Sequence, residues 1–415
     1  MEEYTEINEI EETEKADGEE APERKSFKPE KKTVKGFFIG MAVTFAALAV
    51  ILTCYIKLPV AYSASKPESL SSNKKINEIL ELIDEHYIGE VDEQLLTDYM
   101  FLGLISGLED PYSTYFTEEQ YEELSTSQQG HYVGIGVTII EREEDGGIQI
   151  YTVEEDGPAD EAGIVPGDII KTVNGESVDG FSISEVTEMI QNAESDDIVL
   201  GIYREDSKEE LEVTVTRGLL DSVSVWGGIL EDSDTGYVAI DSFTGVTAEQ
   251  LAEILKQIEE TGADSLIIDL RGNGGGLVSA ACDCLREFIP EGLLVYTEDK
   301  NGNRKEYTSE SGKETEFSIA VLVDGETASA AEIFAGAMQD YGIAKIVGTQ
   351  TFGKGIIQDV YHLNDGSVIR LTVSHYYTPN GNNIHEVGIT PDIVAEYDEN
   401  AETDTQLEAA LEALG

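Results

Sequence analysis

Cysteine and histidine are scarce in this chain of 415 residues, which holds 3 and 5 of them respectively. Cys54 lies inside an apolar run, and Cys282 and Cys284 are two positions apart, so neither a disulfide framework nor a zinc pattern of spaced CxxC pairs is present. No HExxH motif occurs, and no serine lies in a GxSxG elbow. The sequence therefore predicts no metal site, and a Ser-His-Asp triad has little to build from.

Basic residues are also few, since 26 Lys and Arg stand against 84 Asp and Glu and the formal net charge is −58. A chain this acidic repels the phosphates of DNA and RNA, so the composition excludes nucleic-acid partners. The length predicts two to three domains, and a hydrophobic content of 40% is enough to fill their cores.

Long uncharged stretches are absent except for residues 37–56 (FFIGMAVTFAALAVILTCYI). Twenty residues of helix span about 30 Å, the thickness of a bilayer core. Six basic residues lie between positions 24 and 35, and only Lys57 and Lys66 follow closely. This asymmetry predicts a single-pass helix in the cell membrane, with a cytoplasmic N-terminus and an extracytoplasmic remainder. A cleaved signal peptide is the alternative, since a small-x-small site occurs at positions 61–63.

Two helices are predicted after this stretch. Apolar residues recur at helical spacing from Ile76 to Ile83, and a second helix is expected from Glu93 to Leu108, where Asp110-Pro111 ends it. From Gly130 the pattern changes to short strands separated by glycine turns.

The run GPADEAGIVPGDIIKTVNGESV and its flanking strands resemble a PDZ domain over residues 130–217. PDZ domains bind the free end of a chain, which adds as a strand while backbone N–H groups of a glycine-containing loop hold its carboxylate. By this resemblance the loop consists of Val133, Gly134, Ile135, Gly136 and Val137.

Strands and helices alternate over residues 236–400, which is typical of an α/β fold. Three segments of this region hold candidate chemistry. In VLVDGETASAAEIFAGAM, Ser329 follows a strand at the start of a helix, where free N–H groups and the helix dipole stabilise negative charge. The same residue also fits a capping box, Ser329-Ala-Ala-Glu332, which needs no catalysis.

The second segment, GTQTFGKGIIQDV, nearly matches a phosphate loop, but Gly355 stands where a Ser or Thr must coordinate magnesium, which argues against nucleotide binding. A lysine removed from water, such as Lys354 in this apolar setting, has a lowered pKa, so that it can be neutral near pH 7 and then deprotonate a serine. Gln358, four residues along the strand, lies on the same face and can orient the amine.

In the third segment, IIDLRGNGGGLV, glycines follow a strand and offer N–H groups for an oxyanion.

Together these segments resemble the carboxyl-terminal processing (tail-specific) serine peptidases over nearly all of residues 75–395. The motifs occur in the family's order. They are Asp110-Pro-Tyr-Ser-Thr-Tyr-Phe116, Asp269-Leu-Arg-Gly-Asn-Gly-Gly-Gly276, Ala328-Ser-Ala-Ala-Glu332, Gly353-Lys-Gly355, Tyr376-Tyr-Thr-Pro-Asn-Gly381 and Gly388-Ile-Thr-Pro-Asp392.

The resemblance implies a Ser329/Lys354 dyad assisted by Gln358, with oxyanion donors from Gly275, Gly276 and Ala330. It also implies a crotonase-like α/β core, no cofactor, polypeptide substrates that enter by their C-terminus under PDZ control, and a homodimer through the N-terminal helices. A non-catalytic PDZ scaffold of the cell envelope is the alternative.

The predicted domains follow the chain in order. They are a disordered acidic cytosolic tail with a basic juxtamembrane stretch (1–36), the transmembrane helix (37–56), a linker (57–73), a helical region (74–129), the PDZ domain (130–217), the peptidase core (218–400) and a helical tail (401–415).

Overall fold

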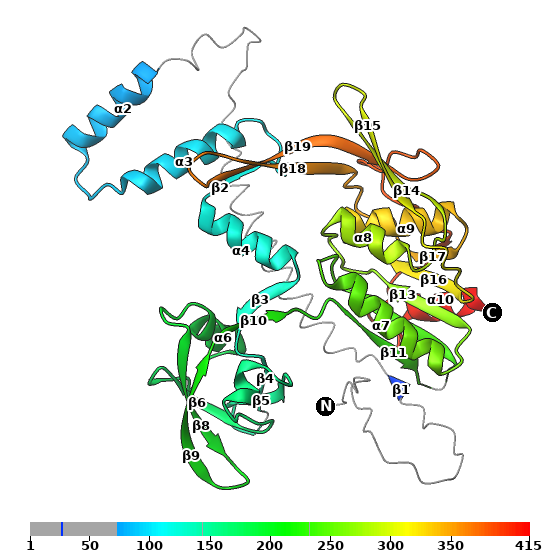
Figure 1. Cartoon of the computed structure of the whole chain (residues 1–415), viewed down its shortest axis with the longest axis horizontal. Coiled ribbons are helices and arrows are strands. Elements are labelled where there is room, and N and C mark those ends of the chain that lie inside the picture. The colour runs from blue at the N-terminus through cyan, green and yellow to red at the C-terminus, as the bar shows by residue number, and fades with distance from the viewer. Residues whose placement is uncertain (1–25, 28–72, 143, 232) are drawn as a thin grey trace.

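The computed structural model describes residues 26–27, 73–142, 144–231 and 233–415 (Figure 1). Three parts follow one another along the chain: a helical segment, a small β-rich domain and a larger α/β domain. A long hairpin of the α/β domain reaches back to the helical segment.

The helical segment holds α2 (Asn73–His86), α3 (Glu93–Ser106) and α4 (Glu118–Gln128), with the short strand β2 (Thr114–Phe116) between the last two. Asp92 caps α3 by accepting a hydrogen bond from Leu95 N, and Thr117 caps α4 through a capping box with Gln120. The helices α2 and α3 occupy the two stretches in which the sequence predicts helices.

The β-rich domain has a sheet in the order β4-β5-β6-β8-β9, with β7 paired to β6 and the helices α5 and α6 beside it. Its core consists of alternate strand residues such as Ile148, Ile150, Ile198, Leu200 and Ile202. The bounds are β4 (Val137–Glu141), β5 (Ile148–Val153), α5 (Pro158–Glu161), β6 (Ile169–Val173), β7 (Glu176–Ser177), α6 (Ile183–Gln191), β8 (Asp197–Arg204) and β9 (Glu209–Thr216). A two-stranded link of β3 (His131–Gly134) and β10 (Gly218–Asp221) joins this domain to its neighbours.

The α/β domain is built on a seven-stranded sheet in the order β1-β11-β12-β13-β16-β17-β20, in which β12, β13, β16 and β17 run parallel. Its central strands are apolar almost throughout because both faces of the sheet are covered. The helices α7, α8 and α9 cover one face and α10 covers the other. The bounds are β1 (Ser26–Phe27), β11 (Val225–Leu230), β12 (Thr235–Ile240), α7 (Thr247–Glu260), β13 (Ser265–Asp269), α8 (Val278–Leu285), β16 (Ser318–Val323), α9 (Ala330–Asp340), β17 (Ala344–Gly348), β20 (Ile393–Val394) and α10 (Thr405–Leu414).

A second sheet of the α/β domain is antiparallel, in the order β15-β14-β19-β18. It consists of β14 (Gly292–Asp299), β15 (Arg304–Ser309), β18 (Ile356–His362) and β19 (Val368–Tyr377). The β18–β19 hairpin extends to the helical segment, where β2 pairs with β19 through Thr114 and Arg370 (Figure 1). This pairing brings the turn before β2 next to the loop that precedes β18.

The transmembrane helix in the predicted fold class has to be corrected. Within the described parts of the chain, no helix combines the length and the apolar composition needed to cross a bilayer. The longest of these helices have 14 residues and so reach about 21 Å, short of the roughly 30 Å of a bilayer core. Residues 37–56, where that helix was predicted, lie outside the described residues. The fold that the structure supports is mixed α/β with a β-rich domain.

Candidate active site

Ser329 is half-buried between the end of β16 and the first turn of α9, with φ 57° and ψ −118°. A non-glycine residue at positive φ costs of order 1–3 kcal/mol, and such strain concentrates at functional sites. Glu332 N–H donates to the backbone carbonyl of Ser329 at 2.9 Å, and the Glu332 carboxylate accepts Ser329 N–H at 2.8 Å. Both contacts use backbone atoms of Ser329, so they remain when the hydroxyl is removed.

Lys354 lies in the loop between β17 and β18. Its neighbour Gly353 has φ +88° and lies so close to the backbone of residues 386–388 that a Cβ would come within 3.0 Å of Val387 N. Burial of the amine is the largest cause that lowers the pKa of Lys354, and the nearby Arg370 guanidinium lowers it further. Asp110 and Glu332 act in the opposite direction without cancelling this shift. The amine is therefore neutral at a lower pH than an ordinary lysine.

The carboxylate of Glu332 joins the Ser329 and Lys354 loops. This side chain is fully buried, and its two oxygens accept four hydrogen bonds. One oxygen accepts from Thr351 Oγ1 at 2.6 Å and Gly353 N at 2.8 Å, and the other accepts from Ser329 N at 2.8 Å and Lys354 N at 2.9 Å. The capping residue predicted from the sequence thus holds both loops in place.

The hydroxyl of Tyr376 makes a second link between these loops. Tyr376 is 1% exposed, and its hydroxyl lies within hydrogen-bond reach of the carbonyls of Ser329, at 2.9 Å, and of Lys354. Burial is the main cause that raises the pKa of this phenol well above its ordinary value, with Glu332 adding to it, so it stays a donor.

Gln358, predicted to orient the Lys354 amine, lies in β18 at a register shift of the β18–β19 pairing. Its amide donates to Thr372 Oγ1 on β19 at 3.3 Å. Among the described residues the Lys354 amine makes no hydrogen bond, and its closest aromatic contact is the ring of Tyr112, with Nζ 4.4 Å from the ring centroid. Tyr112 belongs to the family motif Asp110–Phe116, and no local spacing in the sequence places its ring beside Lys354.

Of the predicted oxyanion donors, Ala330 follows Ser329 directly and Gly275 packs against it. A Cβ on Gly275, which has φ +101°, would come within 2.8 Å of both Ser329 Cβ and Ala330 N, so only glycine fits there. Gly275 N–H itself donates to Asn273 Oδ1 at 2.8 Å. The N–H groups of Gly276 and Ala330 have no hydrogen-bond partner among the described residues, which leaves these two as the available donors.

The predicted PDZ loop, residues 133–137, connects β3 to β4. Ile135 is buried and its carbonyl accepts Ala159 N–H at 2.9 Å, while the Gly136 carbonyl accepts Glu154 N–H at 2.9 Å. The N–H groups of Ile135 and Gly136 donate to no other residue that the structure describes. Burial, with a smaller effect of Asp221, raises the pKa of Glu154 beside this loop.

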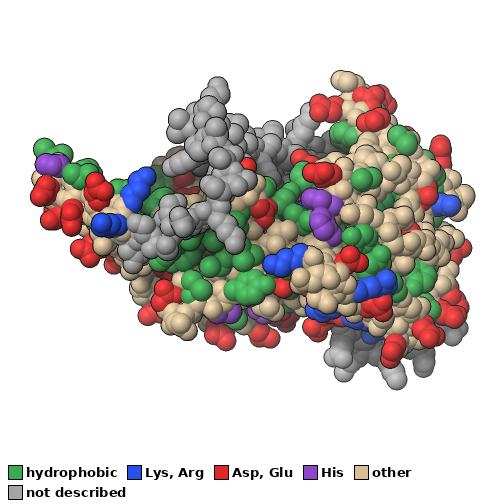
Figure 2. All heavy atoms as spheres, turned by 90° about the horizontal axis from the view of Figure 1, so that it is seen from above, with side chains coloured by type: hydrophobic (Ala, Val, Ile, Leu, Met, Phe, Trp, Pro, Cys, Tyr) green, Lys and Arg blue, Asp and Glu red, His purple; other side chains and the backbone are tan. Residues whose placement is uncertain are grey.

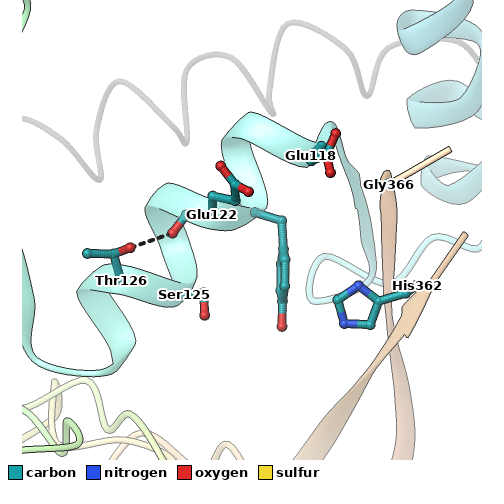
Figure 3. A pocket seen from close by; sticks show the side chains of 7 residues that line it. Glu118, Glu122, Ser125, Thr126, His362 and Gly366 are labelled. Atoms are coloured by element: carbon teal, nitrogen blue, oxygen red, sulfur yellow. Dashed lines mark hydrogen bonds between the residues drawn. The ribbon is translucent and has the colours of Figure 1, made fainter.

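A separate cavity of about 410 Å³ lies between α4 and the end of the β18–β19 hairpin (Figure 3). Glu118, Glu122 and His362 line it, and the rings of Tyr121 and His362 meet edge to face at 5.2 Å. None of the predicted site residues lines this cavity. In the described part of the chain no group of three or more His, Cys, Asp or Glu residues could hold a metal ion.

Three segments of the chain match known protein families. Residues 234–395 match peptidase family S41, residues 149–204 match a PDZ domain, and residues 37–120 match the N-terminal domain of the activating protease CtpB.

Curated proteins and solved structures of the same kind are also similar. The chain is 33% identical to the carboxy-terminal processing protease CtpA of Bacillus subtilis over 88% of this chain and 78% of that protein. It is 35% identical to the carboxyl-terminal-processing protease of Synechocystis, over 75% of each. A solved structure, the photosystem II D1 C-terminal processing protease, is similar with a TM-score of 0.47 and 27% identity, covering 83% of this chain and 92% of that one.

These matches define a class first: the chain is a serine-type peptidase with a PDZ domain and a mixed α/β fold. More narrowly, it belongs to peptidase family S41, together with the carboxy-terminal processing proteases. The resemblance inferred from the sequence motifs is confirmed.

Proposed function

We propose that this peptidase hydrolyses protein substrates near their C-termini with a Ser329–Lys354 dyad, under control of its PDZ domain. The observation that carries the proposal is the shared clamp of Glu332. This carboxylate binds the backbone N–H of Ser329 and of Lys354 and so holds a strained serine and a lysine of lowered pKa on adjoining loops.

In this mechanism neutral Lys354 takes the hydroxyl proton while Ser329 Oγ attacks the scissile carbonyl. The N–H groups of Gly276 and Ala330 stabilise the negative oxygen of the tetrahedral intermediate. Lys354 then gives the proton to the leaving amine, and the acyl-enzyme remains on Ser329. Water, deprotonated by Lys354, attacks this ester, and the proton passes from Lys354 to the departing Ser329 Oγ as the new C-terminus is released. Gln358 contributes by holding Thr372 on the neighbouring strand.

The PDZ domain is proposed to bind the substrate's free carboxylate at the unpaired N–H groups of Ile135 and Gly136. Hydrogen bonds from backbone N–H to a charged carboxylate contribute about 1.5–3 kcal/mol each. The substrate would pair with the edge strand β4, because β4 has a sheet partner on one side only.

A pair of substrates that differ only at the chain end tests this recognition. Amidation of the C-terminal carboxylate is expected to lower kcat/KM about tenfold or more, because it removes one charged hydrogen-bond acceptor. Mass spectrometry of the products identifies the cleavage site, and the Ser329→Ala protein serves as the inactive control. The Gly136→Val variant should lose most of the preference for the free end. Equal cleavage of both substrates by the wild-type protein would contradict PDZ control of entry.

We also propose that α2 and α3 pair with those of a second copy. Figure 2 shows hydrophobic side chains along the arm that these helices form at the left of the view. The exposed set on this arm includes Ile76, Ile79, Leu80, Leu82, Leu95, Leu96, Tyr99, Met100 and Leu104. Helix α2 begins with Lys74 and Lys75 and ends near Asp84 and Glu85, so two antiparallel copies are complementary in charge.

Light scattering after size exclusion tests this pairing. The double variant Ile79→Glu/Leu82→Glu is expected to convert a dimer into a monomer, because it places charges in the apolar contact. Val394→Glu, an exposed position outside the arm, is the matched control and should leave the mass unchanged. A monomeric wild-type protein at micromolar concentration would refute the pairing. The extracytoplasmic location stays a prediction from the sequence.

A further inference from the structure

The amine of Lys354 faces a residue that is far from it in sequence. Its Nζ lies 4.4 Å from the ring centroid of Tyr112, which belongs to the turn between α3 and β2 in the helical segment. Tyr112 is half-buried, and its hydroxyl makes no hydrogen bond to any residue within the described ranges. The ring face, and not the phenol oxygen, is therefore the part of Tyr112 that meets the lysine.

The turn that presents this ring is fixed on both sides. Within it, Asp110 accepts hydrogen bonds from Tyr112 N at 3.0 Å and from Ser113 Oγ at 2.6 Å. From β19, Arg370 Nε donates to the Tyr112 carbonyl at 3.3 Å and Thr372 N donates to Ser113 Oγ at 3.0 Å. The backbone of Tyr112 is thus attached to the hairpin that begins just after Lys354.

Charged groups of three elements act on the pKa of the amine. Asp110 comes from the same turn as Tyr112, Arg370 comes from β19, and Glu332 comes from α9. On the far side of the loop, the backbone of His385 packs directly against Gly355. Burial outweighs the charges in its effect on the pKa of Lys354, so cover from water is the main local influence on this amine.

We propose that Tyr112 is a positioning residue of the active site, whose ring shields the Lys354 amine from water, so that the helical segment completes a site otherwise built by the α/β domain. This inference rests on the proposed function, in which Lys354 is the base. An aromatic face also attracts a protonated amine. In this proposal the ring acts mainly by excluding water, in line with burial as the first cause of the lowered pKa of Lys354.

The test compares Tyr112→Ala with Tyr112→Phe. Removal of the ring is expected to move the acid limb of the kcat/KM profile to higher pH by about one unit, so that the rate at pH 7 falls about tenfold and recovers at alkaline pH. Tyr112→Phe keeps the ring and should match the wild type. Tyr151→Ala, at an exposed tyrosine of the β-rich domain, is the matched surface control. A rate that falls equally at every pH would show a merely structural role and overturn the inference.

A direct titration separates this inference from the dyad itself. Lysine labelled with ¹³C at Cε, in the Ser329→Ala background, gives the titration of Lys354 by NMR, with the resonance assigned by its loss in Lys354→Met. The midpoint should move to higher pH in Tyr112→Ala and stay in place in Tyr112→Phe. An unmoved midpoint would overturn the role of Tyr112, whereas full activity of Lys354→Met would instead overturn the dyad.

Discussion

Replacement of Ser329 by alanine is expected to lower kcat for peptide hydrolysis by about 10⁴- to 10⁶-fold, as in other serine peptidases that lose their nucleophile. The fold should persist, because the hydrogen bonds that join the N–H and the carbonyl of residue 329 to Glu332 remain in the alanine variant. Hydrolysis of an unstructured protein, followed by mass spectrometry of the products, measures the loss. Near-wild-type cleavage by the alanine variant would refute Ser329 as the nucleophile.

The Lys354→Met variant is the second variant in this experiment. The substitution keeps a long apolar side chain, removes the base, and is expected to reduce the rate by about 10²- to 10⁴-fold. Because the serine hydroxyl remains, a strongly electrophilic phosphonate should still label Ser329 slowly in this variant and not at all in Ser329→Ala. Labelling of both variants at the wild-type rate would point to a different nucleophile.

Substitution of Glu332 by glutamine is expected to destabilise the protein and remove most of its activity. Each carboxylate oxygen accepts two hydrogen bonds. In either orientation, the glutamine NH₂ would face donors, so up to two buried N–H or O–H groups lose their acceptor. An unsatisfied buried group costs about 1–3 kcal/mol, so the free energy of unfolding should fall by roughly 2–6 kcal/mol. Urea unfolding measures the change in the free energy of unfolding. Peptide hydrolysis measures the loss of activity that is expected when the Ser329 and Lys354 loops lose their shared hydrogen-bond acceptor.

The chain contains a matched control for this variant. Ser182 and Glu185 at the start of α6 form the same capping box as Ser329 and Glu332, but Glu185 is exposed and its acceptors serve only its own helix. Glu185→Gln is expected to cost no more than about 1 kcal/mol and to leave hydrolysis unchanged. If the two variants lost equal stability, the Glu332 carboxylate would be an ordinary helix cap and not a clamp between loops.

Local sequence patterns were sufficient to predict the helices α2 and α3, the α/β architecture and the family. The alternation of strands and helices over residues 236–400 predicted the α/β fold. The segments that hold Asp269 to Gly276, Ser329 and Lys354 follow the strands β13, β16 and β17. The helix start at Ser329 also followed from its capping box. These features depend on backbone conformation and on neighbours a few residues apart, which a sequence displays directly.

Contacts between residues that are far apart in the sequence could be identified only from the tertiary structure. Glu332 was predicted as a cap, yet three of its four hydrogen bonds come from residues 351–354. Gln358 was expected to meet the amine of Lys354, but the register shift in β18 accompanies its bond to Thr372. Gly275 was expected as an oxyanion donor, but its N–H is already bound by Asn273.

The sequence by itself determined the class of this protein, a PDZ-containing serine-type peptidase of family S41, because its motifs are local and ordered along the chain. The tertiary structure alone decided which groups surround the proposed base. Tyr112 and Lys354 are more than two hundred positions apart in the sequence, and they meet only because β2 pairs with the far strand of the β18–β19 hairpin. Strand pairing of this kind depends on packing between whole elements, and no local spacing encodes it.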